Sequence, residues 1–297
     1  MIQNRIKQED VKLKKDLSKS DFNSAMSKRA STSLKNAVLG QAVGNYTKSY
    51  ETWRRVSNVV NSFKEELTTK KIVEWQVLDL GCGDGYHLML LNSLKEIREK
   101  KVHFRGIDIS PANIMLAKQV AQDLKIDNTT FAVDNIEKMD FTDTEFDIVI
   151  CTDVIEHIVA PEKFVGCVFR VLKPGGLAII TTPNLDNSLV KIIRWITSKK
   201  IESSVRKDGH AEEEHANETG HGHISVKGLS EWIKIFQESG FAVEQIKRGS
   251  MLFGGPKYNR HPLLFSFFLI FDKIFDWLHF PKKLSEAHTY KLRKYML

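Results

Sequence analysis

Short apolar runs alternate with stretches of helical periodicity from about residue 75 to about residue 250. The apolar runs predict six strands, at 77–80, 104–109, 129–133, 146–151, 177–182 and 241–248. The periodic stretches between them predict helices at 86–100, 111–125, 161–172 and 226–239, and a further helix precedes the first strand at 45–75. Strands that alternate with helices favour right-handed crossovers and a doubly wound, mostly parallel α/β sheet.

A hydrophobic insertion follows the sixth strand, at about 255–284, and a seventh strand is predicted at about 286–294. Within the insertion, residues 263–280 are mostly apolar and helical in pattern. Their charged and imidazole side chains would share one face of the helix and are Asp272, Lys273, Asp276 and His279. Four interpretations stay open: the helix caps an active site over a lipophilic acceptor, lies in a membrane interface, forms a homodimer contact, or packs as a core helix on the sheet. The basic pair at 282–283 favours the membrane surface.

Two parts of the chain differ in composition. We expect residues 1–44 to form a basic arm, partly disordered or helical, and residues 45–297 to form one domain with its core at 70–250. The arm suits nucleic acid or an anionic membrane, and equally a solvated tail. The whole chain has 44 Lys and Arg against 37 Asp and Glu, and 42% of its residues are hydrophobic, which excludes a wholly disordered chain.

The cysteines and the apolar runs bear on the compartment. Cys82, Cys151 and Cys167 have neither metal-ligand nor redox spacing, so we expect free thiols in a reducing compartment. The first residues lack the apolar segment of a secretory signal. The longest apolar run, at 263–271, is far shorter than the about 20 residues that cross a bilayer. We therefore expect a cytoplasmic protein, with peripheral membrane contact as an alternative.

Glycines and acids follow the predicted strands at the points where a ligand would bind. The first strand runs into Gly81, Gly83 and Gly85, whose backbone a ligand can approach closely. The second strand ends at Asp108, where a carboxylate can accept hydrogen bonds from ribose hydroxyls. A nicotinamide-binding loop would have its third glycine one residue later, where Tyr86 stands, so the spacing disfavours that cofactor.

Four segments in this order resemble the motifs of class I S-adenosylmethionine-dependent methyltransferases. The run 77–85 resembles their motif I, and 106–110 resembles their acidic ribose-binding motif. The run 146–149 resembles their fourth-strand motif, and 172–176 resembles the turn before their fifth strand. The resemblance covers about residues 70–250, and the motif pattern is most similar to the ubiquinone-biosynthesis O-methyltransferases.

The resemblance implies a transferase on a Rossmann-like sheet of seven strands, with S-adenosylmethionine as its cofactor. The residues that it implies around the cofactor are Tyr46, Asp79, Gly81, Cys82, Gly83, Gly85, Asp108, Ile109, Asp134, Asn135 and Thr152. Asp134 and Asn135 would meet the adenine. Tyr46 would form a lid over the methionine end, although it could equally belong to the packing stripe of its helix.

The segment after the fourth strand is the candidate catalytic centre. His157, whose ordinary pKa is near neutral, is the natural base for an acceptor proton, with Glu156 beside it. Asp153, Glu156, His157 and the later His223 resemble the metal ligands of two families: the ubiquinone-pathway enzymes and the small-RNA 3′-end 2′-O-methyltransferases. That resemblance implies a Mg²⁺, Mn²⁺ or Zn²⁺ ion. Asp153 replaces their first glutamate, and many relatives carry the Glu-His pair without a metal.

We therefore expect an enzyme that methylates an oxygen of a small, lipophilic acceptor. Methylation of an RNA ribose is the alternative within the same family, supported by the basic arm but not by any RNA-binding motif. A nicotinamide-dependent oxidoreductase and a non-catalytic cofactor-binding protein are alternatives of other classes.

Overall fold

The computed structural model of the chain describes residues 50–98, 100–138, 141–186, 224–250, 262–279 and 281–295. The predicted arm at 1–44 lies outside these ranges, so the arm and the two-part domain organisation stay predictions. Within the described ranges, no helix combines the length and the apolar character that crossing a bilayer requires.

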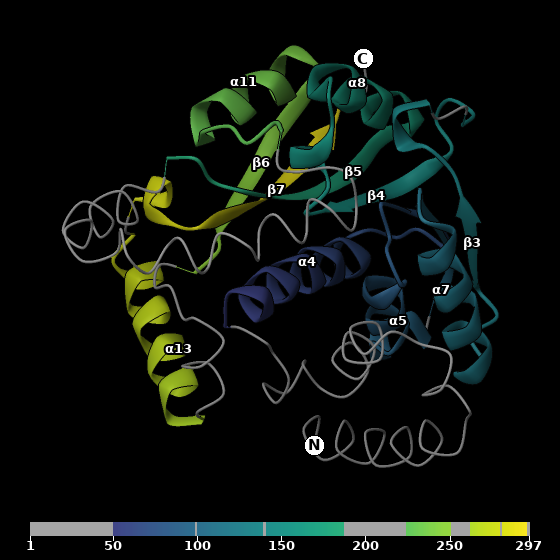
Figure 1. Cartoon of the computed structure of the whole chain (residues 1–297), viewed down its shortest axis with the longest axis horizontal. Helices are drawn as coiled ribbons and strands as arrows, with labels where there is room; N and C mark the ends of the chain where they lie inside the picture. Colours follow the sequence, from purple (N-terminus) through teal and green to yellow (C-terminus); the bar gives the residue numbers. More distant parts are fainter. Residues whose placement is uncertain are drawn as a thin grey trace, which may run out of the picture.

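Seven strands form one sheet in the order β3-β2-β1-β4-β5-β7-β6 (Figure 1). Their bounds are β1 Glu74–Leu80, β2 Lys101–Asp108, β3 Thr129–Val133, β4 Phe146–Thr152, β5 Leu172–Pro183, β6 Phe241–Arg248 and β7 Ala287–Lys294. Neighbouring strands from β3 to β5 are parallel, whereas β7 is antiparallel to both β5 and β6. The predicted mostly parallel sheet of seven strands is confirmed.

The helices follow the predicted order, with one difference. Their bounds are α4 Tyr50–Thr69, α5 Tyr86–Asn92, α6 Lys95–Arg98, α7 Pro111–Asp123, α8 Pro161–Val171, α11 Leu229–Glu238 and α13 Pro262–Trp277, with short 3-10 turns η2 Ile136–Lys138, η3 Ile155–His157 and η4 Lys282–Leu284. The prediction of one continuous helix at 86–100 is wrong. Ser93 follows α5, and its hydroxyl donates to the carbonyl of Leu90 at 2.7 Å, a local bond that competes with helix continuation.

Two hydrophobic clusters lie on opposite faces of the sheet, which makes the fold three-layered. Alternate strand residues belong to different clusters, as in Val77 against Leu78 and Ile148 against Val149. The first cluster includes side chains of α4, α5 and α7, and the second includes those of α8 and α11. Figure 1 shows α4 on one side of the sheet and α8 with α11 on the other.

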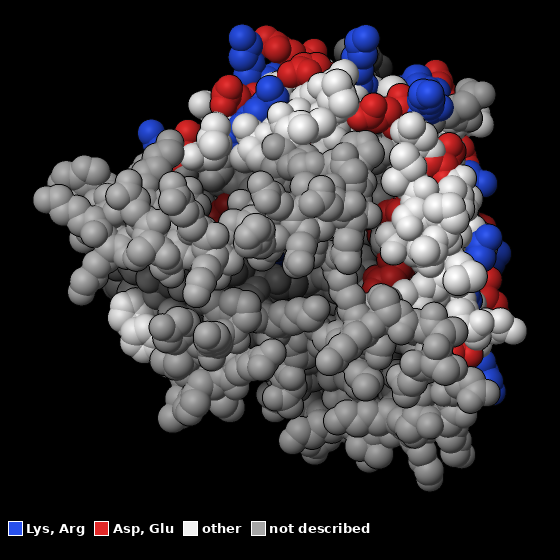
Figure 2. Space-filling model, in the orientation of Figure 1, with Lys and Arg blue, Asp and Glu red and all other residues white. Residues whose placement is uncertain are grey.

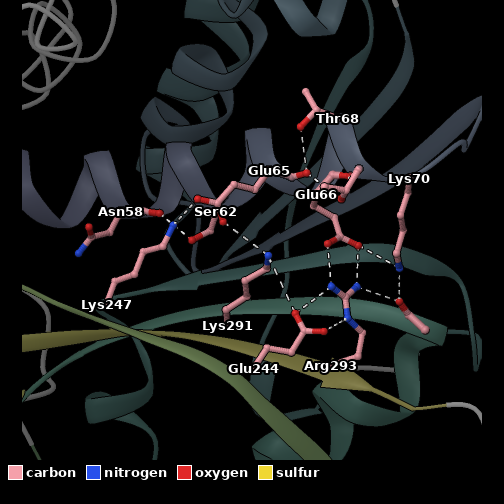
Figure 3. A network of polar contacts seen from close by, with 12 residues as sticks. Asn58, Ser62, Glu65, Glu66, Thr68, Lys70, Glu244, Lys247, Lys291 and Arg293 are labelled. Carbon is pink, nitrogen blue, oxygen red and sulfur yellow. Dashed lines mark hydrogen bonds and ion pairs between the residues drawn. The ribbon is translucent and has the colours of Figure 1, made fainter.

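Polar contacts fix α4 to the β6–β7 end of the sheet (Figure 3). Arg293 on β7 binds both oxygens of Glu66 on α4, at 2.6 and 2.7 Å, and both oxygens of Glu244 on β6, at 2.7 and 2.9 Å. Glu66 is 1% exposed, so the guanidinium compensates a buried charge. The arrangement sets where the first turns of α4 lie relative to the carboxyl ends of the strands.

The turn predicted at 173–176 lies within β5 as an irregularity. Phe146 of β4 pairs with Leu172, and Ile148 pairs with Leu177, so several residues of β5 bulge between two ladder positions. Gly175, in this bulge, has a φ of 75°, and its carbonyl accepts from Nη1 of Arg293 at 3.0 Å. The same arginine therefore holds both α4 and the bulge.

The side chains of α13 that the structure describes do not pack as those of a core helix, so that interpretation of the insertion is wrong for these residues. Ile270, Ile274 and Trp277 are 57%, 43% and 77% exposed, whereas Asp272 is 1% exposed. The three cysteines are free thiols, as predicted, with Cys82 and Cys151 buried and Cys167 half-buried.

Candidate active site

The loop after β1 turns through three glycines with positive φ angles, 72° at Gly81, 55° at Gly83 and 77° at Gly85. A Cβ at Gly81 would lie 2.5 Å from a side-chain carbon of Val154, so both the backbone and the packing require glycine. The N–H of Gly81 donates to the carbonyl of Ile107 at 2.8 Å, which fixes the loop beside β2. A Cβ at Gly83 would have no neighbour within 4 Å, so that side of the loop faces open space that a ligand can enter.

Asp108, at the end of β2, lies against this loop. Its Oδ2 accepts from the N–H of Gly83 at 2.9 Å, and its Oδ1 accepts from the N–H of Ser110 at 2.9 Å. Ser110 is the N-cap of α7, as predicted, and accepts from the N–H of Asn113 at 3.3 Å. The carboxylate is thus fixed in orientation, and Oδ2 can still accept a hydrogen bond from a ligand hydroxyl.

Asp79, at the end of β1, is a fully buried carboxyl group. Neither oxygen has a hydrogen-bond partner within the described residues. Burial, followed by the nearby charge of Asp108, raises the pKa of Asp79 to about 8. At neutral pH the group is therefore mostly protonated, and it suits a polar or cationic ligand that would supply the missing partner.

Cys82 was predicted among the cofactor-binding residues, but its side chain points into the core. It is 4% exposed, and a Cβ on Gly106 would lie 2.9 Å from its Sγ. Burial raises the pKa of the thiol, so it is a neutral packing group. Only the backbone of Cys82 is left for a cofactor contact.

The end of β3 brings Asp134 and Asn135 beside Asp108. The N–H of Asp134 donates to the carbonyl of Asp108 at 3.1 Å, and the Oδ1 of Asp134 accepts from the N–H of Asn135 at 2.7 Å. Asn135 in turn accepts from the N–H of Glu137 at 2.9 Å, so both predicted residues also shape a turn. Ile109 is 61% exposed next to them, and its apolar surface suits the face of a planar base.

Thr152, at the end of β4, meets a histidine that the sequence analysis did not select. Its hydroxyl lies 3.2 Å from Nδ1 of His87, which stands at the start of α5. The ring of Tyr86 lies against that of His87, with centroids 4.0 Å apart. Burial lowers the pKa of His87 to about 4, so its imidazole is neutral at physiological pH.

Asp153 is held in an uncommon backbone conformation, with a φ of 53°. Its N–H donates to the hydroxyl of Thr181 at 3.0 Å, and that hydroxyl donates to Oδ1 of Asp153 at 2.9 Å. Oδ2 lies 3.2 Å from Nε of Arg55 on α4, and Nη1 of Arg55 lies 2.9 Å from Oε2 of Glu286. A guanidinium therefore bridges a carboxylate after β4 and a carboxylate before β7. The positive φ of Asp153, which these contacts hold in place, is a backbone strain of the kind that is typical of functional sites.

The predicted catalytic pair lies on η3, directly after Asp153. Glu156 is 1% exposed, and burial, followed by the charge of Asp153, raises its pKa to about 8. The carbonyl of Glu156 accepts from the N–H groups of Ile224 at 3.0 Å and Ser225 at 2.9 Å, so the chain returns to η3 at that point. His157 is half-buried beside it.

Three of the four predicted metal ligands, Asp153, Glu156 and His157, lie in the part of the chain that the structure describes, and they do not form an ion-binding group there. Among those residues, no group of three or more His, Cys, Asp and Glu side chains could hold an ion. Asp153 is bound by Arg55 and Thr181, and His223 lies outside the described residues, as does the predicted lid residue Tyr46. The donors that are described do not fit a metal centre.

The structure thus gathers Asp79, the glycine loop, Asp108, Ile109, Asp134 and Asn135 at neighbouring strand ends, with Thr152 and Asp153 beside them. Sequence reasoning missed His87, Arg55 and Glu286. The position of His87, two residues after the last glycine, was an available signal. No sequence signal identified Arg55 and Glu286, because the residues that they contact lie far from them along the chain.

A family model described as a methyltransferase domain matches residues 73–240. This match begins just before β1 and ends between α11 and β6, so it contains the ends of β1, β2, β3 and β4 but neither β6 nor β7.

Several curated relatives carry the same name. The ubiquinone biosynthesis O-methyltransferase of human mitochondria is 29% identical over 179 residues, which cover 58% of this chain and 46% of that protein. The ubiquinone biosynthesis O-methyltransferase of Rickettsia typhi is 33% identical over 132 residues, which cover 44% of this chain and 49% of that protein. The chain spans about half the length of the curated relatives it matches.

Solved structures share the fold at low identity. The geranyl diphosphate C-methyltransferase of Streptomyces coelicolor, determined with Mg²⁺, a substrate analogue and S-adenosyl-L-homocysteine, aligns with a TM-score of 0.52. The identity is 12%, and the alignment covers 80% of this chain and 76% of that chain. At this identity the likeness supports the Rossmann-like fold alone.

Proposed function

The chain belongs to the methyltransferase-domain family, and from this membership we propose that it transfers the methyl group of S-adenosylmethionine to an oxygen atom of a small, lipophilic acceptor. The observation that carries the proposal is the carboxylate of Asp108, fixed over a three-glycine loop by the N–H of Gly83 at 2.9 Å. A loop without Cβ atoms and an acid at the next strand end suit a nucleoside at the carboxyl edge of a parallel sheet.

The residues present fit this cofactor. Asp108 would accept from the ribose hydroxyls, and Ile109, Asp134 and Asn135 would border the adenine. Asp79 offers a buried carboxyl group without a protein partner, which suits the ammonium of the methionine moiety. Neighbouring carboxyl groups at two strand ends thus complement the ribose and the charged end of one molecule.

S-adenosylmethionine, when bound, supplies an activated methyl group and a thioether leaving group. The chain must align the acceptor oxygen with the methyl carbon, exclude water and accept the proton that the oxygen loses. We propose that His157 takes this proton as the new oxygen–carbon bond forms. Thr152 and Asp153, fixed by His87, Thr181 and Arg55, would form the wall against which the acceptor lies.

The divalent metal stays a prediction. Of its described candidate donors, Asp153 pairs with Arg55, and Glu156 is buried with a pKa raised to about 8, which disfavours the ionised form that binds a cation. In this arrangement the guanidinium of Arg55 supplies the positive charge beside Asp153.

The lipophilic nature of the acceptor rests on the relatives named for ubiquinone biosynthesis, which share about half their length with this chain. Contact with a membrane, where such acceptors partition, and a cytoplasmic location belong to the same proposal. The homodimer contact is a further alternative for the insertion.

RNA methylation is the second candidate, and the described surface gives it little support. Figure 2 shows lysine and arginine side chains interspersed with aspartate and glutamate along the upper and right edges of the visible face. Such mixed charge on the described part of this face is not the basic stripe that binds a phosphate backbone. The nicotinamide alternative is disfavoured because Tyr86 occupies the position of the third glycine.

Titration calorimetry with S-adenosylmethionine and S-adenosylhomocysteine tests the proposal. We expect binding of both, and a loss of about tenfold or more in affinity for Asp108→Ala, since a charge-assisted hydrogen bond contributes roughly 1.5–3 kcal/mol. Asp127→Ala, at an exposed position before β3, is the matched control and should bind as the unmodified chain does. If the folded protein takes up neither ligand, the proposal is wrong.

The acceptor class is tested by methyl-labelled cofactor with a mixture of lipophilic catechols and, separately, with short RNA. Label in the catechol oxygens supports the proposal. Label in RNA alone would overturn the small-molecule assignment while leaving the cofactor assignment intact.

A further inference from the structure

The described face of α13 that points away from the protein is apolar. Its side chains recur at helical spacing and are Phe267, Ile270, Phe271, Ile274, Trp277 and Leu278, here called the apolar stripe. Their exposed fractions run from 37% at Phe271 to 77% at Trp277. A contiguous exposed apolar surface of this kind marks an interaction site.

Two acidic side chains of α13, Asp272 and Asp276, lie on the side of the helix that meets Arg248. Asp272 is 1% exposed, its Oδ1 lies 3.4 Å from Nη1 of Arg248, and its carbonyl accepts from Nη2 of Arg248 at 2.5 Å. Asp276, one turn later, accepts from Nε of Arg248 at 2.8 Å and also pairs with Arg54 on α4. One acidic side chain, that of Asp272, is therefore buried on the inner side of the helix, whereas the apolar stripe is exposed.

The helix stands away from the sheet (Figure 1). A cavity of about 750 Å³ lies on its inner side, and the lining includes Asn58 of α4, Lys247 of β6 and Phe275 of α13. Arg54 and Arg248 thus fix which face of α13 is presented outward. Hydrophobic packing alone would have turned the stripe toward the protein.

The charges around the stripe indicate its partner. Lys273 is exposed on α13, and Lys282 and Lys283 are exposed on η4, directly after the helix. Exposed lysines beside an apolar helix face that carries tryptophan are typical of helices that lie in a membrane interface and attract anionic lipids. A two-fold contact through the same stripe with the helices parallel would bring Lys282 and Lys283 of two copies close together, which disfavours that arrangement.

We infer that α13 docks the protein on an anionic bilayer, with the apolar stripe among the lipids at headgroup depth and with Lys282 and Lys283 at the lipid phosphates. This inference deepens the proposed function, because it names the element that would bring the active site to a lipophilic acceptor. Vesicle binding involves no turnover, so its failure is distinguishable from failure of the methyl-transfer proposal.

The test is cosedimentation of the full chain with vesicles of phosphatidylcholine containing phosphatidylglycerol, and with phosphatidylcholine alone. We expect binding to the anionic vesicles that weakens with salt, and a loss of about tenfold or more for Ile270→Glu combined with Ile274→Glu. The matched control is Val73→Glu combined with Met115→Glu, two positions that are 81% and 68% exposed elsewhere on the protein. The control should bind within about twofold of the unmodified chain.

Quenching by brominated lipids locates the contact. The fluorescence of the unmodified chain should be quenched on binding, and Trp277→Phe should remove most of that quenching. Equal vesicle binding by the stripe variant and the control overturns the inference. A dimer in sedimentation that dissociates only in the stripe variant also overturns it, and assigns the stripe to a second copy.

Discussion

The Nε atom of Arg55 lies 3.2 Å from the Oδ2 atom of Asp153, and the same guanidinium lies 2.9 Å from Glu286. One side chain of α4 thereby joins the end of β4 to the start of β7. These segments border the candidate acceptor wall, so the position of α4 controls its shape.

Arg55→Ala should lower kcat by roughly 10- to 100-fold, because Asp153 and Glu286 would repel one another and shift a positioned wall. Cofactor affinity in calorimetry should change by less than about threefold, since Asp108 and the glycine loop are untouched. Lys64→Ala, which removes another paired cation of the same helix, is the control. An Arg55→Ala variant with full kcat would contradict the positioning role, and Arg55→Lys should restore only part of the rate.

Asp79→Asn should flatten the dependence of stability on pH. The pKa of Asp79 in the folded protein, about 8, lies above its ordinary value of 3.8. The folded state therefore holds a proton that the unfolded state releases, so the contribution of Asp79 to the free energy of unfolding is complete below pH 3.8 and is lost as the pH rises toward 8. By pH 7 this loss is on the order of 4 kcal/mol. Thermal unfolding without ligand should show that the stability of the variant rises relative to that of the unmodified chain from pH 5 to pH 8. The affinity of the variant for the cofactor should be lower than that of the unmodified chain.

The matched control for that experiment is Asp127→Asn, at an exposed position. Its profile should run parallel to that of the unmodified chain. If the stability of Asp79→Asn also ran parallel to that of the unmodified chain across the pH range, Asp79 would be ionised in the unliganded protein.

Gly85→Ala should destabilise the protein by roughly 1–3 kcal/mol. The new Cβ would lie 2.9 Å from the ring of Phe131, at a φ of 77° that alanine adopts with strain. Gly166→Ala on α8 is the matched control, because its Cβ would meet nothing within 4 Å and a helix favours alanine by about 1 kcal/mol. Urea denaturation should therefore move the two midpoints in opposite directions.

His157→Ala should lower kcat by roughly 10²- to 10⁴-fold if the imidazole is the base, with cofactor affinity unchanged. His103→Ala, at an exposed site on β2, controls for loss of a histidine. The same measurement on His87→Ala separates the two candidates. A large loss for His87 with none for His157 would transfer the role of base to the start of α5.

Arg293→Met should cost about 3–5 kcal/mol, because Glu66 would be left buried without its main partner. Glu66→Gln combined with Arg293→Met should recover part of this loss, since no buried charge is then left unpaired. Arg105→Met, which removes the more exposed pair with Glu145, should change the free energy of unfolding by less than about 1 kcal/mol. Additive losses in the double variant would argue against a coupled pair.

The strands and the cofactor loop were predictable because their signals are local. Alternating apolar positions, glycines at special turns and the cap at Ser110 each depend on a few neighbouring residues. Because β1, β2 and β3 are neighbours in the sheet, Asp79, Asp108 and Asp134 lie at neighbouring strand ends, and no side-chain contact has to be known to predict this.

The contacts of Arg55 and the orientation of α13 were not predictable in this way. Periodicity identified which residues of α13 share a face, but not which face points inward. That choice depends on Arg248 at the end of β6 and on Arg54 of α4, and both contacts are long-range. The helix predicted at 86–100 is interrupted at Ser93 and Leu94, where the apolar periodicity continues, so periodicity alone did not indicate the break.

The strand order also constrains how the protein is made. β7 is the last strand along the chain but lies between β5 and β6, so β6 has no neighbour in the sheet until the ribosome has supplied residues 287–294. Until then the backbone edge of β5 is exposed to other nascent chains. Translation that pauses before residue 287 should therefore produce an aggregation-prone intermediate that lacks two strands of its sheet.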